Sequence, residues 1–274
     1  MYDVFPGDPV DNVGPVNQSQ VACTLGFDVS EPAEIVLQIA AAVPQTETMT
    51  IVSNGVAVEA LELPGRQHLV RAPKGLLTAT YTATTGPGDE PPPVTEVDRI
   101  VALRPSRYCP SDKIVGYAAR QFGASDPVTT VRTITAWVHD NLTYESGSSG
   151  PSTDALDTLV DGRGVCRDYA HLVATLCRAL DIPARVAAVY APGLSPMDFH
   201  LVVETALDGV WRVWDATMLA PRQTLIRIAT GRDAADTALA TTLSGRLTMP
   251  QLMITAIAPG DLPYDDHAGL VTLP

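Results

Sequence analysis

The sequence predicts an α+β protein: a β-rich, sandwich-like N-terminal domain over residues 1–105, followed by a second domain over residues 106–274. Three observations lead to this prediction. Short β-branched runs broken by turn residues fill positions 20–85. Capped segments with helical periodicity follow from residue 111, and strand-like runs return near residue 186. Helices in series followed by strands are typical of an α+β domain.

The N-terminal runs are expected to pair as an antiparallel sheet or a small sandwich. The run 49–63 contains Asn54-Gly55 between apolar residues, and this dipeptide is a strong signal for a two-residue hairpin turn. His68 is the one histidine here, and no acid/base cluster surrounds it. We therefore expect a structural role for this domain, with a docking role left open. The segment Gly86–Val94, rich in proline and glycine, is expected to be an exposed loop or linker.

Three helices and three strands are expected in the second domain. The predicted helices are 112–122, capped by Ser111 and ended by Gly123; 127 to about 142, capped by Asp126; and one that starts at Ser152 or Thr153 and ends at Gly162. The predicted strands are 186–190, 199–207 and 210–215, the last two joined by an Asp208-Gly209 turn. The apolar run near the C-terminus contains Pro250, which predicts an edge strand or a broken one.

Composition limits the function classes. The 274 residues carry 31 acidic and 18 basic side chains, a formal charge of −13, without a basic cluster of the kind that tracks a phosphate backbone. Nucleic acid and anionic membranes are therefore poor partners. The sequence has no run long enough to span a membrane, and residues 1–14 lack the features of a leader peptide, so we expect a cytoplasmic protein. Four cysteines without CxxC spacing suit a reducing compartment.

Cys166 is the candidate nucleophile. It follows Gly162 and Gly164 and opens a predicted helix, where unpaired N–H groups and the helix dipole favour a thiolate. A backbone N–H there can also face a developing oxyanion. Considered alone, a cysteine is more often a buried structural residue. Cys177 fits that description, because it lies eleven residues on, roughly 16 Å along the same apolar helix face.

The predicted hairpin 199–217 supplies a base and an orienting acid. With a two-residue loop at Asp208-Gly209, Leu207 faces Val210 and the register carries His200 and Asp215 to the same face of neighbouring strands. Their Cα atoms would then be about 7–8 Å apart, which is within side-chain reach. A cysteine, a histidine and an aspartate in this arrangement satisfy the requirements of nucleophilic catalysis.

Five motifs in register resemble the transglutaminase-like superfamily, which shares the papain-like cysteine hydrolase plan. They are Gly164-Val165-Cys166, Tyr169-Ala170, Ile182-Pro183-Ala184-Arg185, Asp198-Phe199-His200 and Trp211-Arg212-Val213-Trp214-Asp215-Ala216-Thr217. The blocks 103–108 and 231–236 also resemble bacterial members that carry a β-rich N-terminal region. The resemblance implies a papain-like transglutaminase core, with helices packed on an antiparallel sheet. It further implies Cys166 as nucleophile, His200 as general base and acid, and Asp215 as the residue that fixes the imidazole tautomer.

The chain departs from the family pattern at one strand. The usual His-Ala-Trp-x-Glu is His200-Leu201-Val202-Val203-Glu204 here, so Glu204 is kept while the aromatic wall of the substrate cleft is missing. Other side chains receive lesser roles. We expect His139 to face solvent, His171 to have a supporting or core role, and Tyr144 to pack near the cleft or donate to the oxyanion. Arg167 and Asp168 are expected to form an ion pair on the helix surface.

The sequence thus predicts a cysteine protease or amidase that acts on a protein or peptide through a thioester on Cys166. The acceptor is water or an amine, and hydrolysis is favoured because no acidic groove for an amine is identifiable. The alternative is a non-catalytic peptide-binding domain with the same fold. A metal site built from Cys166, His171 and His200 is a third reading, although the expected enzyme requires neither a metal nor another cofactor.

Overall fold

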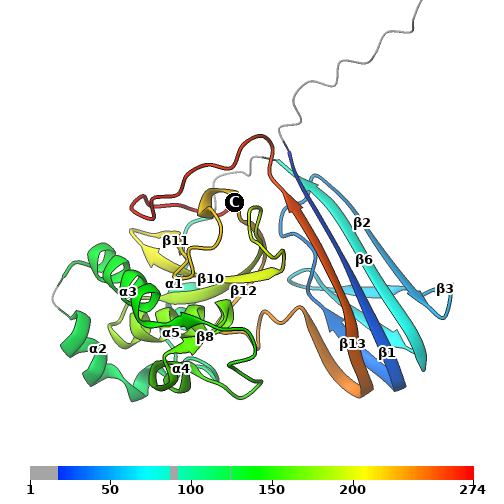
Figure 1. Ribbon diagram of the computed structural model, residues 1–274, viewed down its shortest axis with the longest axis horizontal. Coiled ribbons are helices and arrows are strands. Elements are labelled where there is room, and N and C mark those ends of the chain that lie inside the picture. The colour runs from blue at the N-terminus through cyan, green and yellow to red at the C-terminus, as the bar shows by residue number, and fades with distance from the viewer. Residues whose placement is uncertain (1–17, 87–91, 124) are drawn as a thin grey trace, which may run out of the picture.

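The computed structural model describes residues 18–86, 92–123 and 125–274. It contains a large β-sheet on one side and a helical layer against a smaller sheet on the other (Figure 1). The structure is α+β, as the sequence predicts, and its N-terminal region is rich in strands. The predicted linker 86–94 lies mostly outside the described residues, as do residues 1–14, on which the absence of a leader was argued.

The first sheet is built around β1 (Ser19–Leu37). This strand pairs with β6 over its first half and with β5 over its second half, while β13 runs antiparallel along its other edge. One continuous sheet therefore links the seven described strands, in place of two separate layers, because β1 is long enough to serve both halves. The other six strands are β2 Thr46–Ser53, β3 Val56–Ala57, β4 Ala60–Leu63, β5 Gln67–Ala72, β6 Gly75–Thr85 and β13 Ala240–Ile257.

The hairpin predicted from Asn54-Gly55 is confirmed. It joins β2 to β3, and both turn residues have positive φ, 50° at Asn54 and 82° at Gly55. Two successive left-handed residues define the tight turn that matches the twist of paired strands. The local sequence was sufficient here because asparagine and glycine adopt this backbone at little cost.

The strand that contains Pro250 is an edge strand, as predicted, and it joins the N-terminal sheet although it lies in the second predicted domain. β13 pairs with β1 from Gln20↔Ile257 to Leu37↔Ala240, so the N-terminal sheet is completed by residues from the second predicted domain. The ladder is irregular where Pro250 lies, between the pairs Gly26↔Gln251 and Asp28↔Thr248. Proline is tolerated at such a position because it lacks the N–H that a regular ladder needs. The range 106–274 is therefore not self-contained, because one of its strands pairs with a strand of the N-terminal region.

The helices differ from expectation at their starts. Ser111 makes no capping bond and begins a 3₁₀ turn, η1 (Ser111–Lys113), so α2 starts only at Val115. The third predicted helix is capped by Asp154, whose carboxylate accepts the N–H groups of residues 156 and 157, and not by Ser152 or Thr153. The cap at Asp126 and the stops at Gly123 and Gly162 are confirmed. The helices are α1 Glu96–Ala102, α2 Val115–Phe122, α3 Pro127–Asn141, α4 Ala155–Asp161 and α5 Cys166–Ala179.

The second sheet has the strand order β11-β10-β9-β12 and is antiparallel throughout. Its strands are β9 Ala184–Tyr190, β10 Phe199–Leu207, β11 Val210–Trp214 and β12 Ile226–Gly231. Helix α5 packs against β9 and β10 with nearly all its side chains buried. A short parallel pair, β7 (Thr143–Tyr144) with β8 (Arg163–Gly164), brings Tyr144 beside the start of α5. Among the described helices, each is too short or too polar to cross a membrane.

Candidate active site

Cys166 is the first residue of α5, and the turn before it is fixed by Asp168. The Asp168 carboxylate accepts the backbone N–H of Val165 at 2.9 Å and the hydroxyl of Ser149 at 2.5 Å. A Cβ on Gly164 would lie 2.5 Å from the Cβ of Asp168, so only glycine fits this close approach. The thiol is therefore presented at a helix N-terminus whose geometry is set by its neighbours.

Arg167 and Asp168 form the predicted ion pair, with 3.2 Å between Nη2 and Oδ1. The prediction that this pair lies on the helix surface is wrong, because the Asp168 side chain is fully buried. Arg167 Nη2 also donates to the Gly150 carbonyl at 2.9 Å. The pair thus ties the loop at residues 149–150 to the start of α5, which explains why a charged side chain is buried there.

His200 and Asp215 are brought together by the predicted hairpin. The ladder runs from Leu207↔Val210 to Val203↔Trp214, in the register expected from the Asp208-Gly209 turn. The Nε2 atom of His200 lies 2.8 Å from Oδ2 of Asp215, and both side chains are 1% exposed. Asp215 follows the last residue of β11, so it stands at a strand end as expected, but it is buried and not solvated.

Thr217 completes the surroundings of the Asp215 carboxylate. Its backbone N–H and its hydroxyl both donate to Oδ1 of Asp215, at 2.9 and 2.7 Å. The sequence reasoning gave Thr217 no role, although the Asp-x-Thr spacing is a signal for this local turn. Both carboxylate oxygens are therefore occupied, one by His200 and one by Thr217, which fixes the orientation of the imidazole.

The charges of the site favour an imidazolium. Burial alone would lower the pKa of His200, but the charge and hydrogen bond of Asp215, followed by a hydrogen bond and charge from Cys166, raise it to about 10. Burial opposes ionisation of Asp215 as well, yet His200 and Thr217 outweigh it and lower the pKa of that carboxyl. At neutral pH the pair is thus charged, with the imidazole facing Cys166 on one side and Asp215 on the other.

Tyr144 lies near the Cys166 side chain. Its ring packs 5.9 Å from that of Tyr169, and its residue is 45% exposed. Burial and the nearby Cys166 side chain raise the pKa of the Tyr144 phenol to about 12, and the backbone N–H of Cys166 donates to it. Tyr144 remains protonated at neutral pH, so a hydroxyl donor stands beside the N–H at the start of α5.

The other three described cysteines have different surroundings. Cys23, Cys109 and Cys177 are at most 2% exposed, whereas Cys166 is partly exposed, and all four are free thiols. Burial raises the pKa of Cys23, raises that of Cys109 to about 11 and raises that of Cys177 to about 12. The prediction that Cys177 is a core residue is confirmed, and Cys166 is the accessible thiol among them.

His171 is a core residue, and His139 is exposed, as predicted. The His171 ring stacks on Tyr108 at 5.1 Å, and its Nε2 accepts the N–H of Ala234 at 3.0 Å. Burial lowers its pKa to about 4, so the ring is neutral. These contacts place it between the blocks 103–108 and 231–236 singled out in the sequence. Exposed His139 has its Nδ1 2.9 Å from the carbonyl oxygen of Ala216, next to Asp215.

No signal in the sequence pointed to two buried arginines, Arg178 near the end of α5 and Arg222 after the Asp215 turn. Arg178 donates to the carbonyl of Ala184 at 2.9 Å and to the hydroxyl of Ser106 at 3.1 Å, and so ties α5 to the segment before α2. Arg222 forms a two-point ion pair with Asp265, at 2.8 and 2.9 Å. This pair holds the C-terminal segment against the chain that follows Asp215. Such pairings depend on tertiary packing, and no local pattern announces them.

The described residues contain no group of three or more His, Cys, Asp or Glu side chains arranged to hold a metal ion. The proposed set of Cys166, His171 and His200 does not come together, because His171 faces Tyr108 and Ala234. The side chains that do converge are Cys166, His200 and Asp215, with Tyr144 and Thr217 around them.

An α+β fold with a cysteine at a helix start and a histidine and an aspartate on an adjacent hairpin defines a papain-like cysteine-enzyme fold. A sequence profile described as the transglutaminase-like superfamily matches residues 116–216. A solved structure of a candidate cysteine protease from Cytophaga hutchinsonii is 30% identical, with a TM-score of 0.81, and the match covers 92% of this chain and 95% of that one. The chain belongs to the transglutaminase-like superfamily.

Two mycobacterial proteins are also similar. The uncharacterized protein ML0607 of Mycobacterium leprae is 27% identical over 229 residues, which cover 74% of this chain and 78% of that protein. The uncharacterized protein Rv2569c of Mycobacterium tuberculosis is 33% identical over 89 residues, 32% of this chain and 27% of that protein. The first similarity reaches well beyond the segment that carries the family motifs.

Proposed function

We propose that this protein is a cysteine-dependent amide or peptide hydrolase that works through a thioester on Cys166. One observation carries the proposal: His200, bonded to Asp215 at 2.8 Å in a buried pair, faces the partly exposed thiol of Cys166. A nucleophile, a base and an orienting acid in series are the requirement for activating a thiol. The superfamily relationship and the candidate cysteine protease from Cytophaga hutchinsonii support the same chemistry.

The proposed first step is acylation. The Cys166 thiolate attacks the carbonyl carbon of an amide, and the negative charge moves to the oxygen. The backbone N–H of Cys166 and the hydroxyl of Tyr144 would stabilise this oxyanion, once substrate takes the place that Tyr144 now fills against the N–H. The carbon–nitrogen bond then breaks, and the His200 imidazolium gives its proton to the leaving amine. Asp215 keeps the ring in the required orientation throughout.

The proposed second step is transfer of the acyl group to water. His200 takes a proton from the attacking water, the carbon–sulfur bond breaks, and the carboxylic acid product leaves with the thiolate restored. An amine acceptor would pass through the same thioester and give transamidation. We favour hydrolysis because water is always present, and the sequence offers no acidic groove for an amine. The proposed partner is accordingly a protein or peptide substrate.

A peptide-library screen tests the proposal. The protein is incubated with the library with and without a primary amine, and the products are identified by mass spectrometry, with Cys166→Ala as the control. We expect cleaved peptides from the unaltered chain and none from the variant. Amine adducts without cleavage would replace hydrolysis by transamidation. Saturable peptide binding without any product, and without an acylated form of Cys166, would favour the non-catalytic binding domain.

A further inference from the structure

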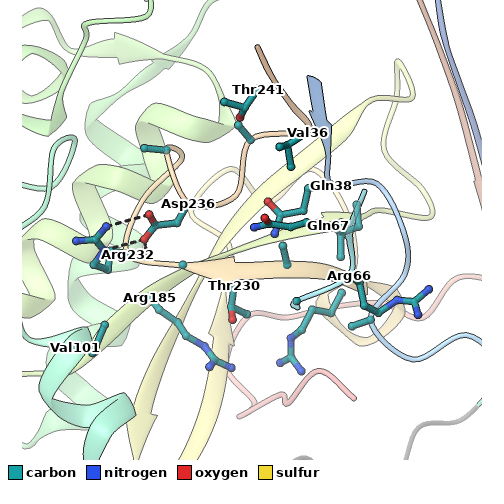
Figure 2. A pocket seen from close by; sticks show the side chains of 18 of the residues that line it. Val36, Gln38, Arg66, Gln67, Val101, Arg185, Thr230, Arg232, Asp236 and Thr241 are labelled. Carbon is teal, nitrogen blue, oxygen red and sulfur yellow. Dashed lines mark hydrogen bonds and ion pairs between the residues drawn. The ribbon is translucent and has the colours of Figure 1, made fainter. Parts of the chain in front are cut away.

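A second site lies between the two sheets, away from Cys166. A cavity of about 810 Å³ opens where β12, the edge strand of the second sheet, faces β1 and β13 of the first (Figure 2). This volume is in the range of ligand pockets, which are common at the junction of two structural layers. None of Cys166, His200 and Asp215 lines the cavity. The cavity is therefore separate from the proposed catalytic site.

The walls carry polar groups that have no hydrogen-bond partner within residues 18–86, 92–123 and 125–274. Gln38 is 92% buried, since its exposed fraction is 8%, yet its amide makes no hydrogen bond to any described residue. Figure 2 shows the side chains of Gln38 and Gln67 projecting into the cavity from the first sheet. The Gln67 amide and the Thr230 hydroxyl also line the cavity, and neither makes a hydrogen bond to a described residue. Amide and hydroxyl groups that line a cavity without bonds to described residues are suited to bind a ligand with both donors and acceptors.

Arg185 supplies the charged end of the site. Its Nε donates to the buried carboxylate of Glu204 at 2.7 Å, and its guanidinium lies 3.9 Å from the centre of the Trp211 ring. Both Nη groups lack an acceptor among the described residues. The ring holds the guanidinium plane in place while the Nη atoms stay free, an arrangement suited to bind a planar carboxylate by two parallel bonds.

The balance of charge at the cavity surface is positive around Arg185. Arg185 and Arg227 share the single carboxylate of Glu204, which is fully buried, so the guanidinium groups and not the acid meet the cavity. The Nε of Arg227 is buried without a partner among the described residues. Of the two lining acids, Asp236 is engaged by Arg232 through both oxygens, and Asp98 accepts two bonds from Thr95.

We propose that this cavity binds a short peptide segment that carries a carboxylate. The carboxylate would pair with the free Nη groups of Arg185, and the Gln38 and Gln67 amides would bond main-chain amides of the peptide. The carboxylate can belong to an acidic side chain or to a peptide C-terminus, since the chemistry at Arg185 is the same. The peptide bound here is a ligand of the inter-sheet cavity, separate from the thiol that would cleave a substrate.

Calorimetric titration of the full chain, in a Cys166→Ala background that prevents turnover, tests the proposal. The probes are acetyl-Ala-Ala-Glu-amide, with a side-chain carboxylate, and acetyl-Ala-Ala-Gln, with a terminal one. The neutral isostere acetyl-Ala-Ala-Gln-amide and glutarate are the comparisons. We expect at least one acidic peptide to bind about tenfold more tightly than both comparisons. Which of the two binds identifies the source of the carboxylate.

Variants locate the site. Arg185→Lys keeps a positive charge beside Glu204 and so preserves the fold, but it lacks the planar pair of donors, and we expect the preference for acidic peptides to fall several-fold. Gln67→Ala should weaken the binding of the acidic and the neutral peptides by the same factor. The surface changes Arg120→Gln and Gln121→Ala on α2 are the matched controls and should have no effect.

The proposal is overturned if the neutral peptide binds as tightly as the acidic ones, or if Arg185→Lys leaves the preference intact. Glutarate binding as tightly as the peptides would overturn the assignment of a peptide. Iodoacetamide labelling of Cys166 in an otherwise unaltered Arg185→Lys chain should stay normal. This readout separates failure of the cavity proposal from failure of the proposed catalysis.

Discussion

Two charged side chains on one face of β10 differ in how completely their partners are hydrogen-bonded. His200 and Glu204 are four residues apart on this strand, and both are buried. The partners of His200 are close and complete, with Asp215 on one side and Cys166 on the other. Glu204 is shared by Arg185 and Arg227, and the Nη groups of Arg185, which lines the inter-sheet cavity, have no acceptor among the described residues. A network with every donor engaged is suited to move a proton within itself, whereas one with free donors is suited to bind a ligand.

The largest effect is expected from Asp215→Asn. The change keeps the size of the side chain but removes the charge that favours the His200 imidazolium, so turnover should fall by roughly 10³–10⁴-fold, as in related triads. Because Asp215 is buried, stability should also fall, by about 1–3 kcal/mol. The measurements are turnover and urea unfolding, with exposed Asp261→Asn as the control. Unchanged specific activity in the folded fraction would make Asp215 a structural acid only.

Further along β10, Glu204→Gln should act on stability. It leaves two arginines without their shared carboxylate in a buried place, and we expect a loss of about 3–5 kcal/mol. Labelling of Cys166 in the folded protein should remain normal. The matched control is Glu62→Gln, whose side chain is 61% exposed and whose effect should be below about 0.5 kcal/mol. Loss of Cys166 reactivity in folded Glu204→Gln would show that the surroundings of Glu204 and of His200 are coupled.

The pH dependence of stability should report the His200–Asp215 pair. A histidine whose pKa is raised on folding stabilises the folded state. Its contribution is complete at pH values below the unfolded pKa of about 6.5, and it disappears as the pH rises through the pKa of the folded state. For His200 that value is about 10, so stability should decline between about pH 6.5 and 10. Asp215, with its lowered pKa, contributes above its ordinary value and loses the contribution as pH falls.

Comparison of thermal unfolding in the unaltered chain and in Asp215→Asn isolates this contribution, because the other titrating groups are common to both. The decline above pH 6.5 should be shallower in the variant. Parallel curves across pH 6 to 10 would contradict the assigned pair.

The smallest effect is expected from Thr217→Val, which removes the hydroxyl bond to Asp215 but leaves the backbone bond. Turnover should fall about tenfold, the range typical of groups that orient a functional side chain. Stability should fall by about 1 kcal/mol. Thr133→Val, on the exposed face of α3, is the matched control. The measurement is the turnover rate of each variant relative to the unaltered chain. An unchanged rate for Thr217→Val would remove this threonine from the orienting network.

The sequence was sufficient for the His200–Asp215 pair because its parts are local, whereas the meeting of Cys166 with this pair was implied by the family resemblance. Only fifteen residues separate His200 from Asp215, and the Asp208-Gly209 turn fixes their register. The position of Cys166 is also set locally, because the sequence places it at the start of an apolar helix. In each case a short pattern determines the geometry, so the contact could be predicted without knowledge of the fold.

The parts that could not be predicted depend on distant segments. β13 pairs with β1 more than 200 residues away in the chain, and an edge strand does not reveal which sheet it will join. The Arg222–Asp265 pair and the sharing of Glu204 by Arg185 and Arg227 also result from packing. The cavity is bounded by both sheets, so it exists only once they are assembled.

The central claim, that Cys166 is a thiol activated by His200, is tested most directly by timed iodoacetamide labelling at neutral pH with mass-spectrometric mapping of all four cysteines. We predict that Cys166 reacts first, that its rate falls sharply in His200→Ala, and that Cys23, Cys109 and Cys177 stay unlabelled until the protein unfolds. Labelling of Cys23 or Cys109 before Cys166, or an equal Cys166 rate without His200, would contradict the claim.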